Sequence, residues 1–378
     1  MSANAETGLS APPLRTQLRR ATFDDHEKIR RLEATLDPEA SSLGDWRALW
    51  AESPLWPALQ STWPIGWVLE TADGEIVGCL SNVPLRYHFR GQSLLAASGR
   101  GWVVAPKYRG FALWLLEERF TQPSVDLFVD TTIGALALEA FDEFAKRIPV
   151  GDWETIAYFV TEYRAFVTRA LQKLNMPFAQ FLVPIAGAGL QLEDAIFSRR
   201  LPRAGSSFAI EATDEFDSRF DQFWDELLRA NTDTLLAARD VATLRWHFST
   251  AMRKRHVWIL TASRNGRLRA YCILKRQGTE FDLYRMRLVD YQTIEPEVDF
   301  LPDMLRVALA RCLTEKVCVL DKLGAGVPKF RAFDGFAPHR RRQTWPYFYR
   351  AADPGLASEL CQPRFWDPSE YDGDASLG

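Results

Sequence analysis

The sequence predicts an α/β protein with mixed sheets, built from two tandem copies of one unit. Three observations predict this class. The chain has 378 residues, about twice the usual size of a single domain. Short motifs recur at a nearly constant spacing in its two halves, and both halves alternate strand-like and helix-like segments in the same order.

A predicted hairpin occurs once in each half. Residues Trp67–Leu69 precede an Asp73-Gly74 pair, and Trp258–Leu260 precede an Asn265-Gly266 pair. Such pairs supply the positive φ angles that a two-residue hairpin turn requires. The two tryptophans are 191 residues apart.

Three further matches keep a spacing of 191 or 192 residues: strands that end in Asp130 and Asp321, the pairs at 21–22 and 212–213, and hexapeptides at 140–145 and 332–337. This indicates duplication.

The spacing of apolar residues predicts the elements of the first unit. In strands, apolar residues are consecutive or alternate with polar ones, whereas in helices they recur every three or four positions. The predicted elements are a strand at Leu18–Thr22, helices at Asp25–Leu36 and Trp46–Trp50, a hairpin at Gly66–Phe89, a strand at Leu95–Val104, a helix at Ala112–Phe120, a strand at Val125–Asp130 and a helix at Ala135–Phe144.

The second unit repeats this order. Its predicted elements are a strand at Ser207–Glu211, helices at Phe216–Leu228 and Ala242–Phe248, a hairpin at Val257–Lys275, a strand at Arg285–Tyr291, a helix at Met304–Glu315, a strand at Val317–Leu320 and a helix through Ala332. Pro and Gly residues at 201–206 favour the boundary between the units. We therefore expect a disordered tail at 1–14, a first unit at 15–200 and a second unit at 207–378.

Composition narrows the function classes. The formal net charge of −3 gives no general attraction to DNA or RNA, so we expect no DNA partner. The five cysteines show no zinc-ligand spacing, which indicates a reducing compartment and no metal site. The N-terminus lacks the pattern of a signal peptide, and no apolar run approaches the ~20 residues of a membrane span. We expect a cytoplasmic protein.

One step of the first unit resembles the GNAT superfamily of acyltransferases. A strand leads into Val104-Ala105-Pro106-Lys107-Tyr108-Arg109-Gly110, and a helix follows. In that family the equivalent turn and helix N-terminus hold the pyrophosphate of acyl-CoA, a general property of exposed N–H groups and the helix dipole. The resemblance implies acetyl-CoA or a longer acyl-CoA as substrate. The implied binding residues are Val104, Lys107, Tyr108, Arg109, Gly110, Phe111 and Ala112.

The resemblance has gaps. The family's glycine positions fall on Ala112 and Trp114, and we expect the Trp114 side chain to point into the core. A downstream Tyr often protonates the departing thiolate in this family, but Phe141 stands there and cannot donate a proton. The strand before the loop carries Ser98, Gly99 and Arg100 in place of a carboxylate base.

The second unit departs further from the family. Its equivalent of the phosphate loop is Val298–Leu301, with Glu295 and Glu297 before it. Acidic side chains there would repel pyrophosphate, so we expect a degenerate copy. The segments Arg239–Phe248 and Phe365–Asp374 resemble parts of uncharacterised bacterial tandem GNAT-like proteins.

Catalytic residues are weakly indicated. His88 and Tyr87 lie on the strand leading to the predicted cleft, and alternation places only one of them on the cleft face. Asn82, Asp130 and Thr131 lie near strand ends that flank the family's acceptor cleft, but Thr131 or Thr132 would equally serve as an N-cap.

Two other groups of residues have a structural and a functional interpretation. Basic clusters at 253–256 and 339–342 could bind an acidic acceptor or form solvated faces. The tryptophans, including Trp46, Trp50, Trp56, Trp63 and Trp67, could stack on a ligand, but we expect most of them in the core.

Three functions remain open. The first is an acyl-CoA-dependent N- or O-acyltransferase acting on a small-molecule or sugar acceptor. The second is a catalytically silent binding or scaffold protein. The third is a Fem-like transferase that uses aminoacyl-tRNA, against which the near-neutral charge counts. The sequence does not specify the acceptor, the acyl length or the oligomeric state.

Overall fold

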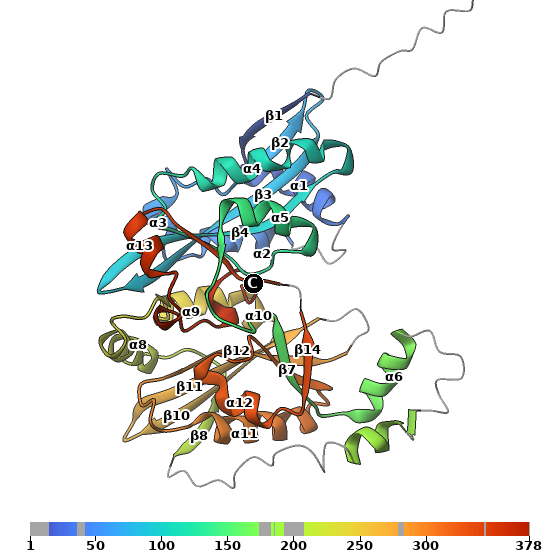
Figure 1. Ribbon diagram of the computed structural model, residues 1–378, viewed down its shortest axis with the longest axis vertical. Helices are drawn as coiled ribbons and strands as arrows, with labels where there is room; N and C mark the ends of the chain where they lie inside the picture. Colours follow the sequence, from blue (N-terminus) through green and yellow to red (C-terminus); the bar gives the residue numbers. More distant parts are fainter. Residues whose placement is uncertain are drawn as a thin grey trace, which may run out of the picture.

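The computed structural model describes residues 15–35, 42–173, 183–184, 186–192, 208–278, 283–343 and 345–377. The predicted tail at 1–14 and the predicted boundary at 201–206 lie outside these residues. Two sheets lie one above the other, and the end of the chain lies between them (Figure 1).

The first sheet has the order β1-β2-β3-β4-β5-β15-β6, with β9 paired to β3. β4 runs parallel to β5, and the other neighbours in this sheet are antiparallel. The strands are β1 (Thr16–Arg20), β2 (Gly66–Thr71), β3 (Ile76–Phe89), β4 (Gln92–Val104), β5 (Leu127–Asp130), β6 (Lys146–Arg147), β9 (Leu236–Ala237) and β15 (Phe348–Ala351).

The second sheet has the order β8-β10-β11-β12-β13-β7-β14, and its single parallel pair is β12 with β13. The strands are β7 (Thr155–Val160), β8 (Ala209–Thr213), β10 (Val257–Arg264), β11 (Arg267–Gln277), β12 (Arg285–Thr293), β13 (Val319–Leu323) and β14 (His339–Arg342). The two sheets therefore repeat one topology, as the sequence predicts.

The repeated units exchange one strand. β7 belongs to the first half of the chain but lies between β13 and β14 of the second sheet, where it is green among orange strands (Figure 1). β15 belongs to the second half but lies between β5 and β6 of the first sheet. Each exchanged strand occupies the equivalent place in its host sheet, so each sheet is completed by the other unit.

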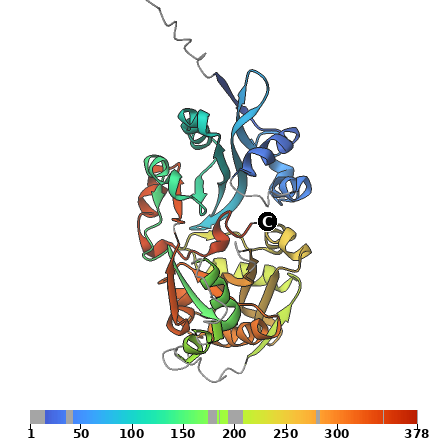
Figure 2. The same cartoon turned by 90° about the vertical axis from the view of Figure 1, so that its right-hand side faces the viewer.

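Helices pack on both faces of the first sheet. Figure 2 shows α1 and α2 on one side of it and α4 and α5 on the other. The helices are α1 (His26–Glu33), α2 (Leu43–Ala51), α3 (Trp56–Leu59), α4 (Ala112–Phe120), α5 (Leu138–Phe144), α6 (Tyr163–Lys173), α8 (Arg219–Ala230), α9 (Val241–His247), α10 (Ser249–Arg253), α11 (Leu301–Thr314), α12 (Arg331–Phe336) and α13 (Pro354–Glu359). Among the described residues, the 3₁₀ turns are η1 (Phe23–Asp25), η2 (Pro106–Phe111), η3 (Ala135–Ala137), η4 (Pro328–Phe330), η5 (Pro363–Phe365) and η6 (Glu370–Asp372).

The two predicted hairpin turns differ. Asn265 and Gly266 both take positive φ angles, 53° and 74°, which is the predicted two-residue turn. In the first hairpin only Gly74 has a positive φ, 78°, and the loop between β2 and β3 runs over residues 72–75. The prediction of a two-residue turn at Asp73-Gly74 is therefore wrong. The Thr71 hydroxyl accepts the Glu75 N–H and holds this longer loop.

Aromatic residues fill the core, as predicted for the tryptophans. Trp46, Trp50, Trp63 and Trp67 are buried, and the indole N–H groups of Trp50 and Trp63 both donate to the carbonyl oxygen of Asn82. All five cysteines are free thiols. Within the described part of the chain, no helix combines the length and apolar character needed to cross a membrane.

Candidate functional site

The first sheet opens between β4 and β5. These parallel strands pair only where Ala96–Ser98 meet Leu127–Val129. Beyond Ser98 the two strands diverge, while β4 continues to Val104 against β3. The divergence coincides with a register shift between β3 and β4, where Gly101 takes a φ of 65°. A bulge of this kind turns a strand away from its neighbour, so the sheet gains an opening at this point.

The opening holds a cavity of about 80 Å³. Backbone of β4, the end of β5 and the start of α5 form its walls. The lining residues are Leu80, Gly99, Arg100, Gly101, Trp102, Asp130, Thr132, Ile133, Gly134, Ala137 and Phe141. Trp102 is one of these lining residues, and its indole N–H is buried without a hydrogen-bond partner among the described residues.

Asp130 supplies the carboxylate of this cavity. It accepts a hydrogen bond from the Gly99 N–H at 3.0 Å and forms an ion pair with Arg119 of α4 at 2.9 Å. Burial raises the pKa of the Asp130 carboxyl to about 6, although Arg119 acts in the opposite direction. Arg119 is itself fully buried and also donates to the carbonyl oxygen of Ala97. This network joins β4, β5 and α4 at the point where the strands separate.

The predicted phosphate loop follows β4 directly. Residues 106–111 form η2, and α4 begins at Ala112. Lys107 and Arg109 are exposed, Tyr108 and Phe111 are half-buried, and the Ala112 N–H donates to the Arg109 carbonyl oxygen. A Cβ placed on Gly110 would meet no atom within 4 Å, so the space beside the loop is open.

The structure corrects the prediction for Trp114. Its side chain is 41% exposed and packs edge-on against Phe111, with ring centroids 4.9 Å apart, instead of pointing into the core. Leu115 and Leu116 occupy the buried face of α4 instead. Phe141 is buried and lines the cavity against Trp102, with ring centroids 5.6 Å apart.

Tyr87 and His88 lie away from the opening. They pair with Leu94 and Ser93 at the far end of β3 and do not line the cavity. The Tyr87 hydroxyl is buried and donates to the carbonyl oxygen of Asp372, and burial raises its pKa well above the usual range. The His88 ring packs on Trp224, and burial lowers its pKa.

The C-terminal segment, residues 366–377, reaches the first opening. The hydroxyls of Thr131 and Thr132 both donate to the Asp374 carboxylate, and Arg100 donates to the carbonyl oxygen of Leu377 at 2.8 Å. Neither threonine caps the following helix, whose turn η3 has Gly134 at its N-cap. The N-cap interpretation of these threonines is therefore wrong, because a carboxylate of the distant C-terminal segment takes their hydroxyls.

The same segment fills the corresponding place in the second unit. β12 and β13 pair at Arg285–Arg287 and then diverge, as β4 and β5 do. Glu370 lies against Arg287 at 3.3 Å, and Ser369 donates to Asp290 at 2.9 Å. Asp321, the counterpart of Asp130, is paired with Arg287 at 2.7 Å. The second opening is therefore occupied by the chain itself.

The second unit's equivalent of the phosphate loop is also filled. Phe300 is buried at the N-cap of α11 and packs against Phe208, with ring centroids 4.7 Å apart. Burial raises the pKa of the neighbouring Asp299 carboxyl. An aromatic ring and a carboxyl group thus occupy the turn in which the first unit exposes Lys107 and Arg109.

Both basic clusters are partly paired with carboxylates. Arg253 pairs with Asp45 at 2.9 Å, and Arg341 and Arg342 pair with Asp321 and Glu154 at 3.5 and 3.6 Å. Within the described residues, no group of three or more His, Cys, Asp or Glu side chains is arranged to hold a metal ion.

Sequence reasoning missed the role of the C-terminal segment. The segments at 239–248 and 365–374, which the sequence singles out separately, lie against each other in the structure. Arg239 pairs with Asp372 at 2.9 Å, and the His247 and Tyr371 rings lie 4.3 Å apart. The sequence signal that could have indicated this role is the high content of Asp, Ser and aromatic residues near the end of the chain.

Comparisons with known proteins support the fold. No family model and no curated protein matches the chain. Among solved structures, a GCN5-related N-acetyltransferase from Anabaena variabilis matches with a TM-score of 0.54 and 12% identity over 90% of this chain and 73% of that one. A probable N-acyltransferase from Enterococcus faecalis gives 0.52 and 11% over 89% and 72%. N-myristoyltransferase from Saccharomyces cerevisiae, with bound myristoyl-CoA, gives 0.53 and 12% over 99% and 87%.

The fold and the opening between parallel strands are those of a GNAT-like fold. More specifically, the chain is a tandem of two GNAT-like units that exchange a strand. The predicted fold class is confirmed. At these sequence identities, the comparisons support the fold alone and not a function.

Proposed function

We propose that the first unit is an acyl-CoA-dependent acyltransferase and that it transfers a short acyl group to an amine or hydroxyl of a small-molecule acceptor. The observation that carries the proposal is the divergence of β4 from β5 directly before η2 and α4. It places an open sheet edge beside a turn with two exposed cations, Lys107 and Arg109. A pyrophosphate at the turn and a pantetheine arm along the sheet edge fit this arrangement.

The size of the cavity favours a short acyl group. About 80 Å³ holds only a few non-hydrogen atoms beside the β4 backbone. Trp102 and Phe141 close its apolar side. Acetyl-CoA or propionyl-CoA fits this space better than a long-chain acyl-CoA does.

Positioning is the main catalytic contribution in this proposal. Phe141 lacks a proton to donate, so the thiolate leaves without a side-chain acid at that position. Asp130 lines the opening and, with a pKa of about 6, is ionised at neutral pH. It is the group we assign to accept the proton from the attacking amine or hydroxyl.

The test is isothermal titration of acetyl-CoA into the wild type and Arg109→Glu. Charge-assisted contacts to phosphate contribute about 1.5–3 kcal/mol each, so reversing this charge is expected to weaken binding by roughly tenfold to a hundredfold. Arg229→Glu is the control, because it makes the same charge change at an exposed position of α8. Acceptor amines are then screened by release of free CoA thiol.

Each outcome separates the candidate functions. Binding that Arg109→Glu weakens, with turnover on an acceptor, supports the proposal. Binding without turnover across a broad amine and hydroxyl screen favours the silent binding protein. Wild type that does not bind any acyl-CoA excludes the proposal and leaves the scaffold or aminoacyl-tRNA-dependent alternatives. Tighter binding of myristoyl-CoA than of acetyl-CoA would contradict the assigned short acyl group.

A further inference from the structure

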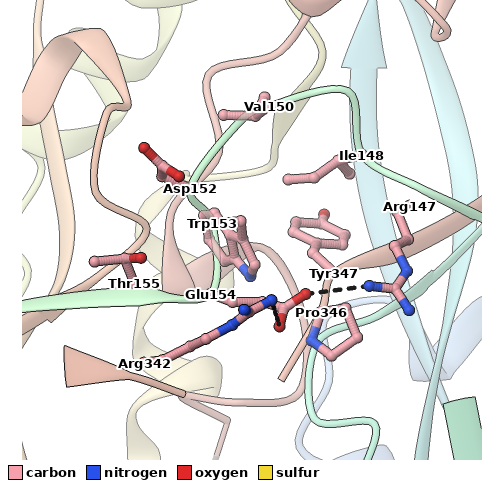
Figure 3. A pocket seen from close by; sticks show the side chains of 10 residues that line it. All are labelled: Arg147, Ile148, Val150, Asp152, Trp153, Glu154, Thr155, Arg342, Pro346 and Tyr347. Atoms are coloured by element: carbon pink, nitrogen blue, oxygen red, sulfur yellow. Dashed lines mark hydrogen bonds and ion pairs between the residues drawn. The ribbon is translucent and has the colours of Figure 1, made fainter. Parts of the chain in front are cut away.

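A second, larger cavity lies where the exchanged strands cross between the sheets. Its volume is about 290 Å³, near the lower end of the range for small-molecule sites. One wall is the connection from β6 to β7, and the other is the connection from β14 to β15. The lining residues are Arg147, Ile148, Val150, Asp152, Trp153, Glu154, Thr155, Arg342, Pro346 and Tyr347 (Figure 3).

Trp153 carries a hydrogen-bond donor without a partner. Its ring is 4% exposed and lies on the Cα atom of Gly324, where a Cβ would come within 2.8 Å of the ring. The indole N–H is buried and has no acceptor among the described residues.

Two guanidinium groups share one carboxylate at the lower side of the cavity. Figure 3 shows Arg147 and Arg342 approaching Glu154 from opposite sides. The Arg147 contact is 3.2 Å and the Arg342 contact 3.6 Å. Arg147 already pairs with a second carboxylate, Asp142, at 3.4 Å. Arg342 therefore keeps more of its five N–H donors for a further carboxylate. This end of the cavity suits an anionic group.

Asp152 marks the other end. Figure 3 places it across the Trp153 ring from Arg147. Its carboxylate is exposed and makes no hydrogen bond or ion pair with the side chains that the structure describes. Asp152 also has a φ of 58°, a left-handed conformation that costs energy for a residue other than glycine. The strained turn presents a free carboxylate beside the cavity, which suits a cationic group.

We propose that this crossover cavity binds a small amino-carboxylate, with an amine at one end of a short apolar chain and a carboxylate at the other. The amine meets Asp152, and the carboxylate meets Arg147 and Arg342. The chain between them lies on Ile148, Val150 and Pro346.

The crossover cavity is separate from the proposed acyl-CoA site. The two cavities have no lining residue in common. Tyr347 lines the crossover cavity, whereas its neighbour Phe348 packs toward Phe141 of the opening, with ring centroids 5.6 Å apart. Binding here can therefore be measured whether or not the first unit transfers acyl groups.

The test is titration calorimetry of the full chain with 4-aminobutyrate, 5-aminovalerate and 6-aminohexanoate. Hexanoate and hexylamine are the matched ligands that lack the amine or the carboxylate. We expect saturable binding of at least one amino-carboxylate and roughly tenfold weaker binding of both matched ligands. No saturable binding of any of the three, or equal binding of hexanoate, overturns the proposal.

Variants locate the site. Asp152→Asn removes the charge while asparagine still tolerates the left-handed backbone, and it should weaken the amino-carboxylate but leave hexanoate unchanged. Arg342→Gln should weaken both ligands. Asp225→Asn and Arg229→Gln on α8 are controls for the charge changes. Unchanged affinity in Asp152→Asn and Arg342→Gln would place the binding elsewhere and contradict the proposal.

Discussion

Arg239 and Asp372 lie 2.9 Å apart and are 133 residues apart in the chain, and their ion pair ties the C-terminal segment to the second unit. Arg239 also pairs with Asp290 at 2.9 Å, and all three side chains are buried. The guanidinium lies over the Tyr371 ring, 4.6 Å from its centroid. One cation therefore holds two carboxylates and an aromatic ring between the sheets.

Loss of this cation should be costly. Arg239→Met would leave two buried carboxylates without their partner, and we expect the free energy of unfolding to fall by about 3–5 kcal/mol. Asp372→Asn should cost less, about 1–3 kcal/mol, because Arg239 keeps Asp290. Urea denaturation measures both. Arg253→Met breaks an exposed ion pair and should change stability by less than about 1 kcal/mol. Similar losses for Arg239→Met and Arg253→Met would contradict this assignment.

His247 should make the protein sensitive to acid. Its ring is buried, its Nε2 lies 2.7 Å from the Ser376 hydroxyl, and burial lowers its pKa well below the ordinary 6.5. Below pH 6.5 the unfolded chain takes up a proton there that the folded chain does not, so stability falls as the pH falls. This contribution to stability is present in full well above pH 6.5 and is lost as the pH falls below it.

The check is urea denaturation of wild type and His247→Gln at pH 7.5 and 5.5. Glutamine keeps a hydrogen bond to Ser376 but does not titrate. The variant should lose less stability than wild type between the two pH values, because its side chain at position 247 takes up no proton on unfolding. An equal loss in both proteins would show that His247 is not the responsible group.

Gly324 should not tolerate a side chain. It has a φ of 82°, and a Cβ there would come within 2.8 Å of the Trp153 ring. Gly324→Ala therefore combines backbone strain with a clash, and we expect it to cost about 2–4 kcal/mol by chemical denaturation. Gly266→Ala is the control, because Gly266 has a φ of 74° but open space around a Cβ, so only about 1 kcal/mol is expected. Equal costs would indicate that Trp153 moves aside.

Because the two units exchange a strand, we expect the folding of each half of the chain to depend on the other half. A fragment of residues 1–200 lacks β15, so the edges of β5 and β6 would be unpaired, and a fragment of residues 201–378 lacks β7. We expect neither fragment to unfold cooperatively by circular dichroism, whereas co-expressed fragments should assemble and purify together. A first fragment that folds alone with the stability of the full chain would contradict this expectation.

Trp102 should limit the acyl group, if the proposed acyl-CoA site is correct. Trp102→Ala would enlarge the opening, and the ratio of kcat/KM for hexanoyl-CoA over acetyl-CoA should rise by about tenfold or more. Leu136→Ala, at a side chain that is 95% exposed, is the control. An unchanged ratio would show that Trp102 does not bound the acyl site.

The order of elements was predictable because local patterns encode it. The prediction of α4 at Ala112–Phe120 matches the structure to the residue, and β12 begins at Arg285 as expected. The exchanged strands were not predicted. Thr155–Val160 has an apolar pattern that specifies a strand, but duplication gives both sheets an equivalent place for it. A local pattern cannot distinguish two equivalent places in duplicated sheets.

The candidate site was predictable only where it is continuous in sequence. The turn from Val104 to Ala112 follows β4 directly, and its position was recognisable. Tyr87 and His88 were selected because they share β3 with the opening, but they lie near its far end. The contact of Asp374 with Thr131 and Thr132 joins residues more than 240 positions apart, and no local signal encodes it.

The sequence by itself determined the repeated order of elements, the α/β class and the difference in charge between the two loops, because spacing, periodicity and side-chain charge are local properties. Tertiary structure decided which sheet β7 and β15 complete and where the C-terminal segment lies. These depend on burial of charges such as Arg239, Asp290 and Asp372, which are favourable only when distant parts of the chain bring their partners together.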